Sequence, residues 1–401
     1  MNQLPLPEEL IALIVEYACV DDGTTARSLL SASKQLMRIV TPIQWHSLAL
    51  SGAGQFCGFA HALSRVSERP IYHLFISDRV ASNARHFWTP SRVSRDGTGT
   101  IEELHSKEER ERIQWRNAQS FILERAAPTL QTLTFLVFDP RNSARRVGDM
   151  LKQTYPNLRE LTIRVPPLQP LFASDPIDLS TIGGNAGFVA TFGNSKAHLL
   201  PRLERLHIAG HYKTSTSAPS RIGSISSGVT HLRLSGIFAY PFTRELAAEL
   251  FARGVLDQDV LVGNPVAHAP PHFVPESVEL LVLQPSTPDY SNSWGTDHGD
   301  SAIQLMGAFE AAARIGTQVL YLPPMVHGYY GYDQAKVDWL DRIGGGAGCW
   351  VPQEEVVVPA EADPSSENLQ SSHGGSMRAP SAGSGMQGYI PSFLNVFLGR
   401  W

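Results

Sequence analysis

The chain has 401 residues, 42% hydrophobic and 18% charged, so it carries enough apolar side chains to fold, which argues against wholesale disorder. Its 33 basic and 38 acidic residues give a formal net charge of -5, which creates no overall field that attracts nucleic acid or anionic lipid. No apolar stretch approaches the roughly 20 residues of a membrane-spanning helix, and three scattered cysteines fit reduced thiols better than a disulfide framework. We therefore expect a cytoplasmic or nuclear protein, with neither nucleic acid nor membrane as a partner.

Residues 1–50 predict a module of three short helices. Pro7 suits the first turn of the first helix, and after the break at Asp21-Asp22-Gly23, Thr24 or Thr25 is expected to cap the second. The apolar positions are, in chain order, Leu10, Ile14, Tyr17, Leu29, Leu30, Ala32, Leu36, Met37 and Ile39. Three such helices enclose too small a core for much stability, so they are expected to lean on a partner or on the next domain.

Four motifs follow one another within residues 4–50. They are Leu6-Pro7-Glu8-Glu9-Leu10 followed by Ile14, then Leu29-Leu30-Ser31-Ala32-Ser33-Lys34, then Arg38, and finally Pro42-Ile43-Gln44-Trp45. In this the chain resembles the F-box proteins, in particular the F-box-like proteins of fungi. The resemblance implies that the module binds the adaptor subunit of a cullin-RING ubiquitin ligase and that the rest of the chain holds a protein client. It also implies leading adaptor contacts at Leu6, Pro7, Leu10 and Ile14, with support from Leu29, Ser33 and Trp45.

One residue departs from that pattern. Ala32 stands where the family often has a larger apolar side chain, which puts the strength of adaptor binding in doubt. The alternative interpretation is an amphipathic helical cap on a repeat domain, because any such cap shows leucines three and four residues apart. The order of the motifs favours docking, since periodicity alone does not require it.

Beyond residue 45 an apolar residue is repeatedly followed by two more, three and five positions later. The eight occurrences are Trp45-Leu48-Leu50, Ile71-Leu74-Ile76, Leu130-Leu133-Phe135, Leu158-Leu161-Ile163, Leu203-Leu206-Ile208, Val229-Leu232-Leu234, Val278-Leu281-Leu283 and, loosely, Thr317-Leu320-Leu322. The 26-residue steps from Leu48 to Leu74 and from Leu206 to Leu232 match the period of leucine-rich repeats. Each unit is expected to be a short strand with its last two apolar residues facing inward.

Helical patterns separate these strands, so we predict an α/β fold in which a short helical module precedes an irregular leucine-rich-repeat-like solenoid, residues 51–350. The helices are expected to back an arc of parallel strands. Their ranges are Ile113 to Ala126, Ser143 to Tyr155, Thr243 to Arg253, Ser301 to Ile315 and Tyr332 to Ile343. Long steps between other units indicate insertions, and the best loop candidates are Ala84 to Lys107, Pro166 to Lys196 and Gln284 to Gly299.

The end of the chain changes composition. Residues 351–388 are rich in Gly and Ser and are predicted to be a disordered linker. Residues 389–401 are apolar, and two interpretations stay open: a segment that docks back as a cap or strand, or a short linear motif.

Catalytic, cofactor and metal motifs give no convincing match, so we expect no enzyme and no cofactor. Ser31-Ala32-Ser33-Lys34 fits a Ser-x-x-Lys pattern, but its companion motifs are missing. Gly344 to Gly348 follows a predicted helix, whereas a phosphate-binding loop follows a strand. His268 and His272 flank Pro270-Pro271, which prevents one helical metal-binding face.

A client is expected on the strand positions that point away from the backing helices. These are Thr134, Leu136, Thr162, Arg164, His207 and Arg233. The basic side chains of Arg164, His207 and Arg233 form a strip on this face that suits an acidic or phosphorylated segment. Charged residues on a solvated sheet are, however, ordinary. The predicted function is client capture for a ubiquitin ligase, and the alternative is a repeat scaffold without ligase docking.

Overall fold

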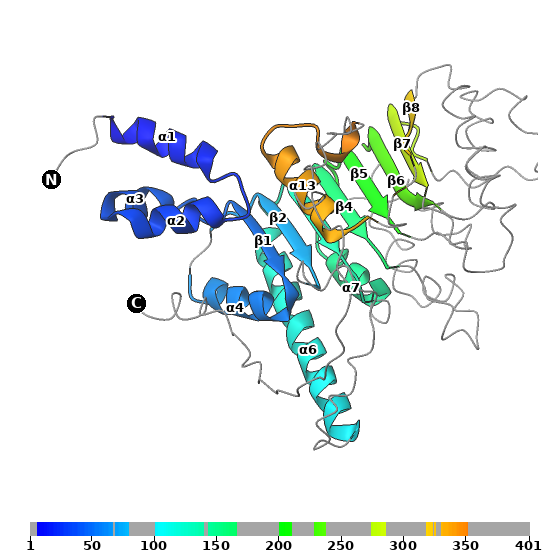
Figure 1. The fold of residues 1–401 in the computed structure, drawn as a ribbon, viewed down its shortest axis with the longest axis horizontal. Coiled ribbons are helices and arrows are strands. Elements are labelled where there is room, and N and C mark those ends of the chain that lie inside the picture. The colour runs from blue at the N-terminus through cyan, green and yellow to red at the C-terminus, as the bar shows by residue number, and fades with distance from the viewer. Residues whose placement is uncertain are drawn as a thin grey trace, which may run out of the picture. The chain divides into compact units, whose positions relative to one another are not determined.

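The computed structural model of the chain describes residues 6–66, 69–79, 101–139, 143–166, 200–210, 228–237, 274–285, 318–323, 325 and 330–351. Within these ranges the protein is α/β, with one open, all-parallel sheet whose eight strands follow the order of the chain (Figure 1). This arrangement is compatible with a solenoid-like array. The strands are β1 Ser47–Ser51, β2 His73–Ser77, β3 Thr132–Leu136, β4 Glu160–Arg164, β5 Arg205–Ala209, β6 His231–Ile237, β7 Leu280–Pro285 and β8 Gln318–Tyr321.

The pairing register confirms seven of the eight predicted strands. The second residues of the strands form one row across the sheet: Leu48, Leu74, Leu133, Leu161, Leu206, Leu232, Leu281 and Val319. The prediction was wrong by one residue in β8, where Val319 lies in the row expected for Leu320. Because side chains alternate along a strand, this slip moves Leu320 and Leu322 to the other face of the sheet.

Neighbouring repeats are joined at the point where each strand begins. The N–H groups of Tyr72 and His73 both donate to the carbonyl of His46, and the same pairing recurs at β3 to β7. At β8 the Gln318 N–H donates to the Glu279 carbonyl. Side chains reinforce it, as where Thr129 Oγ1 donates to the Ile71 carbonyl and Ser277 Oγ donates to that of Val229. Since the contact is made locally at each entry turn, repeats of different lengths can keep one register.

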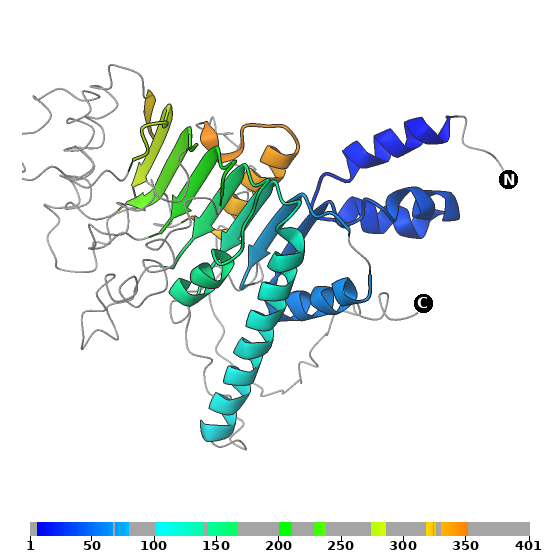
Figure 2. The same ribbon diagram turned by 180° about the vertical axis from the view of Figure 1, so that it is seen from behind.

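One face of the sheet, called here the back face, packs against α4 Gly52–Ser64, α6 Ile101–Ala126 and α7 Ser143–Met150 (Figure 2). The core between them includes Phe56, Leu63, Ile122, Leu123, Val147 and Met150. The predicted backing helices at Ile113 and Ser143 are confirmed, although α7 ends before Tyr155.

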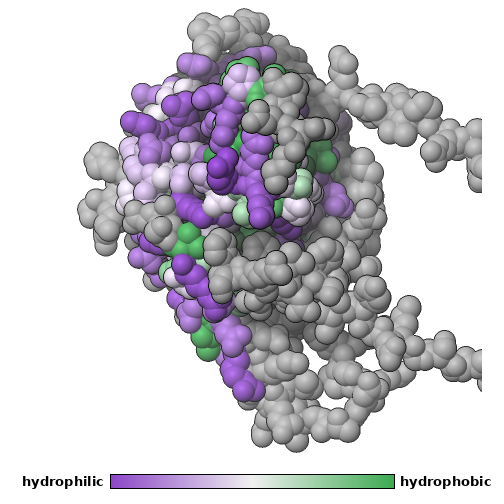
Figure 3. All heavy atoms as spheres, turned by 90° about the vertical axis from the view of Figure 1, so that its left-hand side faces the viewer, coloured by the Kyte–Doolittle hydropathy of each residue, from purple (hydrophilic) through white to green (hydrophobic). Residues whose placement is uncertain are grey.

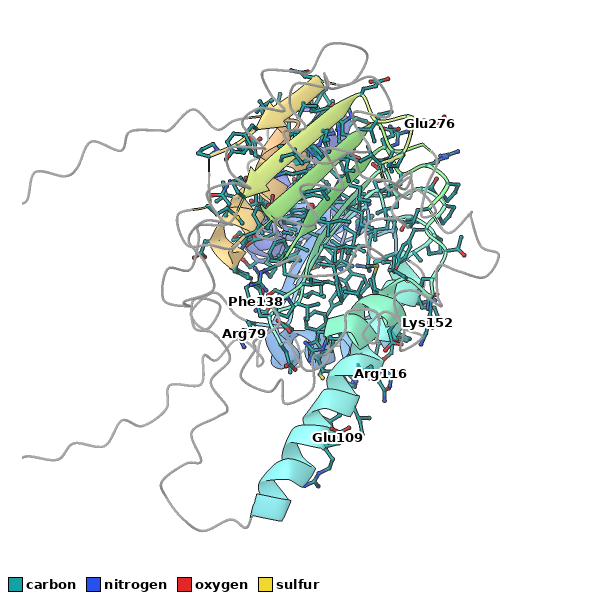
Figure 4. All side chains as sticks on the ribbon, turned by 90° about the vertical axis from the view of Figure 1, so that its right-hand side faces the viewer. Arg79, Glu109, Arg116, Phe138, Lys152 and Glu276 are labelled. Atoms are coloured by element: carbon teal, nitrogen blue, oxygen red, sulfur yellow. The ribbon has the colours of Figure 1, made fainter. Side chains whose placement is uncertain are left out.

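Two predicted boundaries were wrong. Residues 101–107 were expected in a loop but belong to α6, because their Glu and Lys side chains favour a helix without supplying the apolar period that was sought. Gln284 was also expected in a loop but lies in β7. Figure 4 shows α6 extending from Arg116 past Glu109 and away from the sheet. Arg116 of α6 pairs with Asp149 of α7 at 2.6 Å and thereby joins the two helices, and Lys152 pairs with the same carboxylate at 2.5 Å.

The N-terminal module consists of α1 Glu8–Ala18, α2 Thr24–Ala32 and α3 Lys34–Val40, as predicted. Its fully buried core is limited to Ile11, Val15, Cys19, Ala26 and Val40. The expected threonine cap was wrong. The carboxylate of Asp21 accepts the N–H groups of Gly23 and Thr25 instead, at 2.8 and 2.9 Å, because the α2 N-cap position is taken by Gly23.

The other face of the sheet, called here the front face, is covered by α13 Tyr332–Ile343 and the 3-10 turn η4 Gly348–Trp350. We had predicted that α13 backs the sheet together with the other helices, and this is wrong. Tyr332 and Trp339 pack against Phe75, with ring centroids 5.4 and 5.6 Å apart. Apolar front-face residues such as Phe75 and Leu136 therefore form a second core beneath α13.

The chain divides into two units, Met1–Val351 and Pro352–Trp401. The second unit holds the predicted linker and apolar tail and lies outside the described residues, as do the predicted helices at residues 243–253 and 301–315 and most of the predicted insertions. Among the helices that the structure describes, none combines the length and apolar character needed to cross a membrane.

Candidate functional site

Helix α1 carries apolar side chains on both of its faces. Ile11 and Val15 point into the small core of the module, whereas the opposite side exposes a second apolar stripe. The exposed fractions along that stripe are 48% for Leu10, 50% for Leu13, 56% for Ile14 and 76% for Tyr17, and Leu6 at 49% precedes it. Figure 3 shows the side of the molecule on which the module lies in Figure 1, with green apolar side chains among purple hydrophilic ones.

The predicted adaptor contacts fall into two groups. Leu6, Pro7, Leu10 and Ile14 are exposed at the start and along the outer side of α1. Leu29 is half-buried against the core of the module, and the exposed Ser33 accepts the Leu36 N–H through Oγ at the start of α3. Sequence reasoning missed Leu13, although its position three residues after Leu10 puts it on the same stripe.

Trp45 was expected to support adaptor binding through the module, but its side chain belongs to the core on the back face of the sheet. It is 7% exposed, packs edge-on against Phe59 at 5.5 Å and lies beneath the guanidinium of Arg69 at 5.0 Å. Trp45 therefore offers little surface for a direct contact with a partner. The residue instead anchors the chain where the module joins β1.

The six predicted client contacts lie on the front face, as their alternation along the strands requires, but their expected exposure was wrong. Their exposed fractions are 5% for Thr134, 1% for Leu136, 6% for Thr162, 4% for Arg164, 0% for His207 and 5% for Arg233. The segment from Tyr330 to Val351 covers them. The front face therefore presents no basic strip to an acidic client in this conformation.

The two buried arginines are stabilised by neutral groups. Arg164 donates to the carbonyls of Tyr330 and Val137 at 2.9 and 2.6 Å, and its guanidinium stacks 3.8 Å from the ring centre of Phe138. Arg233 donates to Ser235 Oγ at 3.0 Å, to Gln284 Oε1 at 2.7 Å and to the Cys349 carbonyl. Breaking these hydrogen bonds would leave charged donors buried and unpaired, which is costly. The bonds to Tyr330 and Cys349 therefore hold the covering segment in place.

Acidic and hydroxyl groups fasten the covering segment at several further points. Glu160 accepts the indole N–H of Trp350 at 3.0 Å and lies 2.6 Å from Arg342 Nε. The hydroxyls of Ser51 and Tyr332 are 2.7 Å apart. Lys336 reaches the module and pairs with Asp22 at 2.7 Å.

The ion pair with Lys336 also affects the acidity of Asp22. Burial alone acts to raise the pKa of this carboxyl, but hydrogen bonds from Lys336 and Thr24, together with the charge of Lys336, lower it overall. The carboxylate of Asp22 is therefore favoured in the folded protein, and α13 is tied to the loop that begins α2.

Cys349 and His207 resemble a nucleophile and base pair in residue type, with Sγ 3.7 Å from Nδ1. Burial raises the pKa of Cys349 to about 12, so its thiol is protonated and a poor nucleophile at neutral pH. The nearby cavity, which Thr134, Thr162 and Trp339 help to line, measures about 10 Å³, room for about one water molecule. This cavity is therefore too small to hold a substrate beside the thiol.

Among the side chains that the structure describes, no three or more His, Cys, Asp and Glu residues cluster closely enough to hold a metal ion. Comparison with known protein families gives no matching family model, and comparison with curated proteins gives no match either.

Proposed function

We propose that this protein is a substrate-recognition adaptor of a cullin-RING (SCF-type) ubiquitin ligase. Its N-terminal module docks onto the adaptor subunit of the ligase, and its repeat domain presents a protein client. The observation that carries the proposal is the exposed apolar stripe of α1, formed by Leu10, Leu13, Ile14 and Tyr17 on a module with a very small core. The order of the F-box-like motifs within the same residues supports this choice of partner.

The energetics of the stripe favour a bound state. Full burial of a large apolar side chain stabilises an interface by about 1.5–3 kcal/mol, and the exposed side chains of Leu10, Ile14 and Tyr17 lie at helical spacing on one side of α1. A partner that covers this stripe also adds apolar contacts to a module whose own core cannot supply many.

The repeat domain supports the client-binding half of the proposal through its architecture. We interpret the sheet as a leucine-rich-repeat-like solenoid, since one apolar row crosses all eight strands and the entry turns of β2 to β7 make the same pair of hydrogen bonds. Because Tyr330 to Val351 covers Thr134, Arg164 and Arg233, a client contacts other surfaces of the domain while this cover is closed.

A second candidate is a repeat-based binding scaffold that does not dock onto a ligase. Ala32 favours it, because this exposed residue ends α2 at the position where F-box proteins often place a larger apolar side chain. Loss of that side chain reduces the apolar area available to the ligase adaptor.

A pull-down of the full chain with the purified adaptor subunit tests the proposal. The wild type is expected to retain the adaptor, and the triple variant Leu6→Ala, Pro7→Ala, Leu10→Ala is expected to lose it. Val337→Ala is the matched control, because Val337 is a 55% exposed apolar residue on α13, outside the module. If neither wild type nor triple variant retains the adaptor while both stay folded, the ligase proposal fails and the scaffold takes its place.

A further inference from the structure

The segment that covers the front face ends in a short stretch with the features of a lid. The segment is η4, Gly348–Trp350, and it is joined to α13 by the run Gly344-Gly345-Gly346-Ala347. We infer that η4 is an acid-opened lid over the middle of the front face and that His207 is the residue that senses the proton. This inference does not depend on ligase docking.

The glycine run gives the lid a hinge. Gly345 has φ +95° and Gly348 has φ +60°, in the left-handed region that other residues rarely adopt. A Cβ atom on Gly348 would lie 2.9 Å from the Asp338 carbonyl, so the close approach of the lid to α13 requires glycine there. Three consecutive glycines join α13 to the lid, and their N–H groups donate to the carbonyls of Leu340, Arg342 and Asp341 at the end of α13. The lid therefore moves by opening this short run while the rest of α13 stays packed.

Side-chain contacts, rather than strand pairing, hold the lid down. The Cys349 carbonyl accepts from Arg233, and the Trp350 indole donates to Glu160. The Trp350 ring also packs against Val282 and Leu322 beneath it. These contacts can break without disturbing the hydrogen-bonded register of the sheet.

His207 lies directly beneath the lid and has no exposed surface. Its Nε2 is 2.9 Å from Ser235 Oγ, its Nδ1 faces Cys349 Sγ at 3.7 Å, and its ring centre is 4.6 Å from that of Tyr330. The three groups in contact with the ring, from β6, the lid and the segment before α13, are therefore all uncharged when the thiol and phenol carry their protons.

Among the described side chains, no carboxylate contacts the ring of His207. Arg233 on β6 is positive and shares the Ser235 hydroxyl with His207. Asp338 of α13 accepts from the Tyr330 hydroxyl at 2.6 Å and from Gln334, and Glu160 of β4 accepts from Arg342 and Trp350. On the remaining side, Arg164 of β4 adds another positive charge to the front face. A proton on His207 therefore places a further positive charge in a buried layer whose described carboxylates, Asp338 and Glu160, form hydrogen bonds with other residues.

The sign of the pH effect follows from the histidine. Burial first, and the charge of Arg233 second, lower the pKa of His207 well below its ordinary value of 6.5. Above pH 6.5, neutral His207 contributes its full stabilisation to the closed state. This stabilisation is lost as the pH falls below 6.5. If His207 regains an ordinary pKa when the lid opens, the opening constant rises about tenfold from about pH 7.5 to about pH 5.5.

Asp338 acts in the opposite direction. Burial raises the pKa of its carboxyl, so protonation of Asp338 favours the closed state as the pH falls. A comparison with His207→Gln, which keeps a neutral hydrogen-bonding side chain, isolates the contribution of the histidine.

Hydrogen exchange of the full chain at the same two pH values, corrected for the intrinsic pH dependence of exchange, tests the lid. Peptides covering residues 344–351 are expected to lose about tenfold in protection in acid, while peptides from β3 and β4 keep theirs. In His207→Gln this difference is expected to disappear. The inference is overturned if the lid of the wild type is equally protected at both pH values, or if lid and strands lose protection equally. Both outcomes are read from the wild type, so they hold even if the variant fails to fold.

Discussion

The N-terminal module exposes apolar side chains, whereas the front face of the sheet buries charged ones. Leu10 and Ile14 are about half exposed on α1, while Arg164 and Arg233 lie almost wholly beneath α13 and η4. Both arrangements are unusual for their residue types. The front face is covered by a segment of the same chain, and we propose that the apolar stripe of the module is covered by a separate protein, the ligase adaptor.

The strongest test of the internal cover is truncation of its largest side chain. Trp339→Ala removes a buried ring that packs on Phe75, and a loss of about 3–5 kcal/mol in the free energy of unfolding is expected. The matched variant Val337→Ala changes an exposed residue two positions earlier and is expected to alter stability by less than about 0.5 kcal/mol. Urea unfolding measures both. Equal effects would show that α13 is not packed on the sheet as described.

A smaller effect is expected at the acidic anchor of the cover. Glu160→Gln removes the charge that pairs with Arg342 and weakens the acceptor of the Trp350 indole. We expect a loss of about 1.5–3 kcal/mol in stability, because hydrogen bonds to charged groups contribute in that range. Glu204→Gln, at an exposed position before β5, is the control. An unchanged urea midpoint in Glu160→Gln would rule out the anchor.

The pH dependence of global stability sharpens the comparison further. Burial, and the charge of His46 second, lower the pKa of His73 from 6.5 to about 4, so neutral His73 stabilises the fold above pH 6.5. That contribution falls by at most about 1.4 kcal/mol per pH unit as the pH drops toward 4. Asp78 and Asp338, whose pKa values burial raises, oppose this trend. Urea unfolding across this range, repeated with His73→Gln, should show a shallower fall in the variant.

The smallest effect on stability is expected in the module itself. Ile14→Ser changes a side chain that is 56% exposed and should alter the free energy of unfolding by about 0.5 kcal/mol or less. The same variant should nevertheless weaken retention of the ligase adaptor, since the residue belongs to the outer stripe of α1. A marked loss of stability would instead place Ile14 in an internal contact.

Much of the sheet could be predicted because its signal is local. An apolar residue followed by two more, three and five positions later, fixes both the strand and the face that each leucine takes, and seven strands follow from it. The rule failed in β8 because Val319-Leu320-Tyr321-Leu322 is apolar throughout and fits either register.

The face of the sheet on which α13 packs could not be predicted in the same way. The helical spacing of Tyr332, Ala335 and Trp339 predicts an apolar stripe, but helical periodicity does not say which face of a sheet receives that stripe. The missed signal lies on the strands. Phe75, Leu136 and Val282 occupy positions expected to face solvent, and large apolar residues there indicate a second buried layer.

The exposure of the proposed adaptor contacts could be predicted only in part, for a similar reason. Leu10 and Ile14 follow from the motif and lie exposed, whereas Trp45 sits where the module joins β1 and its burial depends on Phe59 and Arg69 from later segments. A motif identifies residue types in order. It does not report which later segment of the chain will cover them.

The measurement that tests the central claim most directly is a hydrogen-exchange footprint of the full chain with and without the purified ligase adaptor. We predict that protection increases at α1 Glu8–Ala18 and its neighbours in the module, while α13 Tyr332–Ile343 stays unchanged. No footprint at saturating adaptor, or a footprint on α13 instead of α1, would contradict the account.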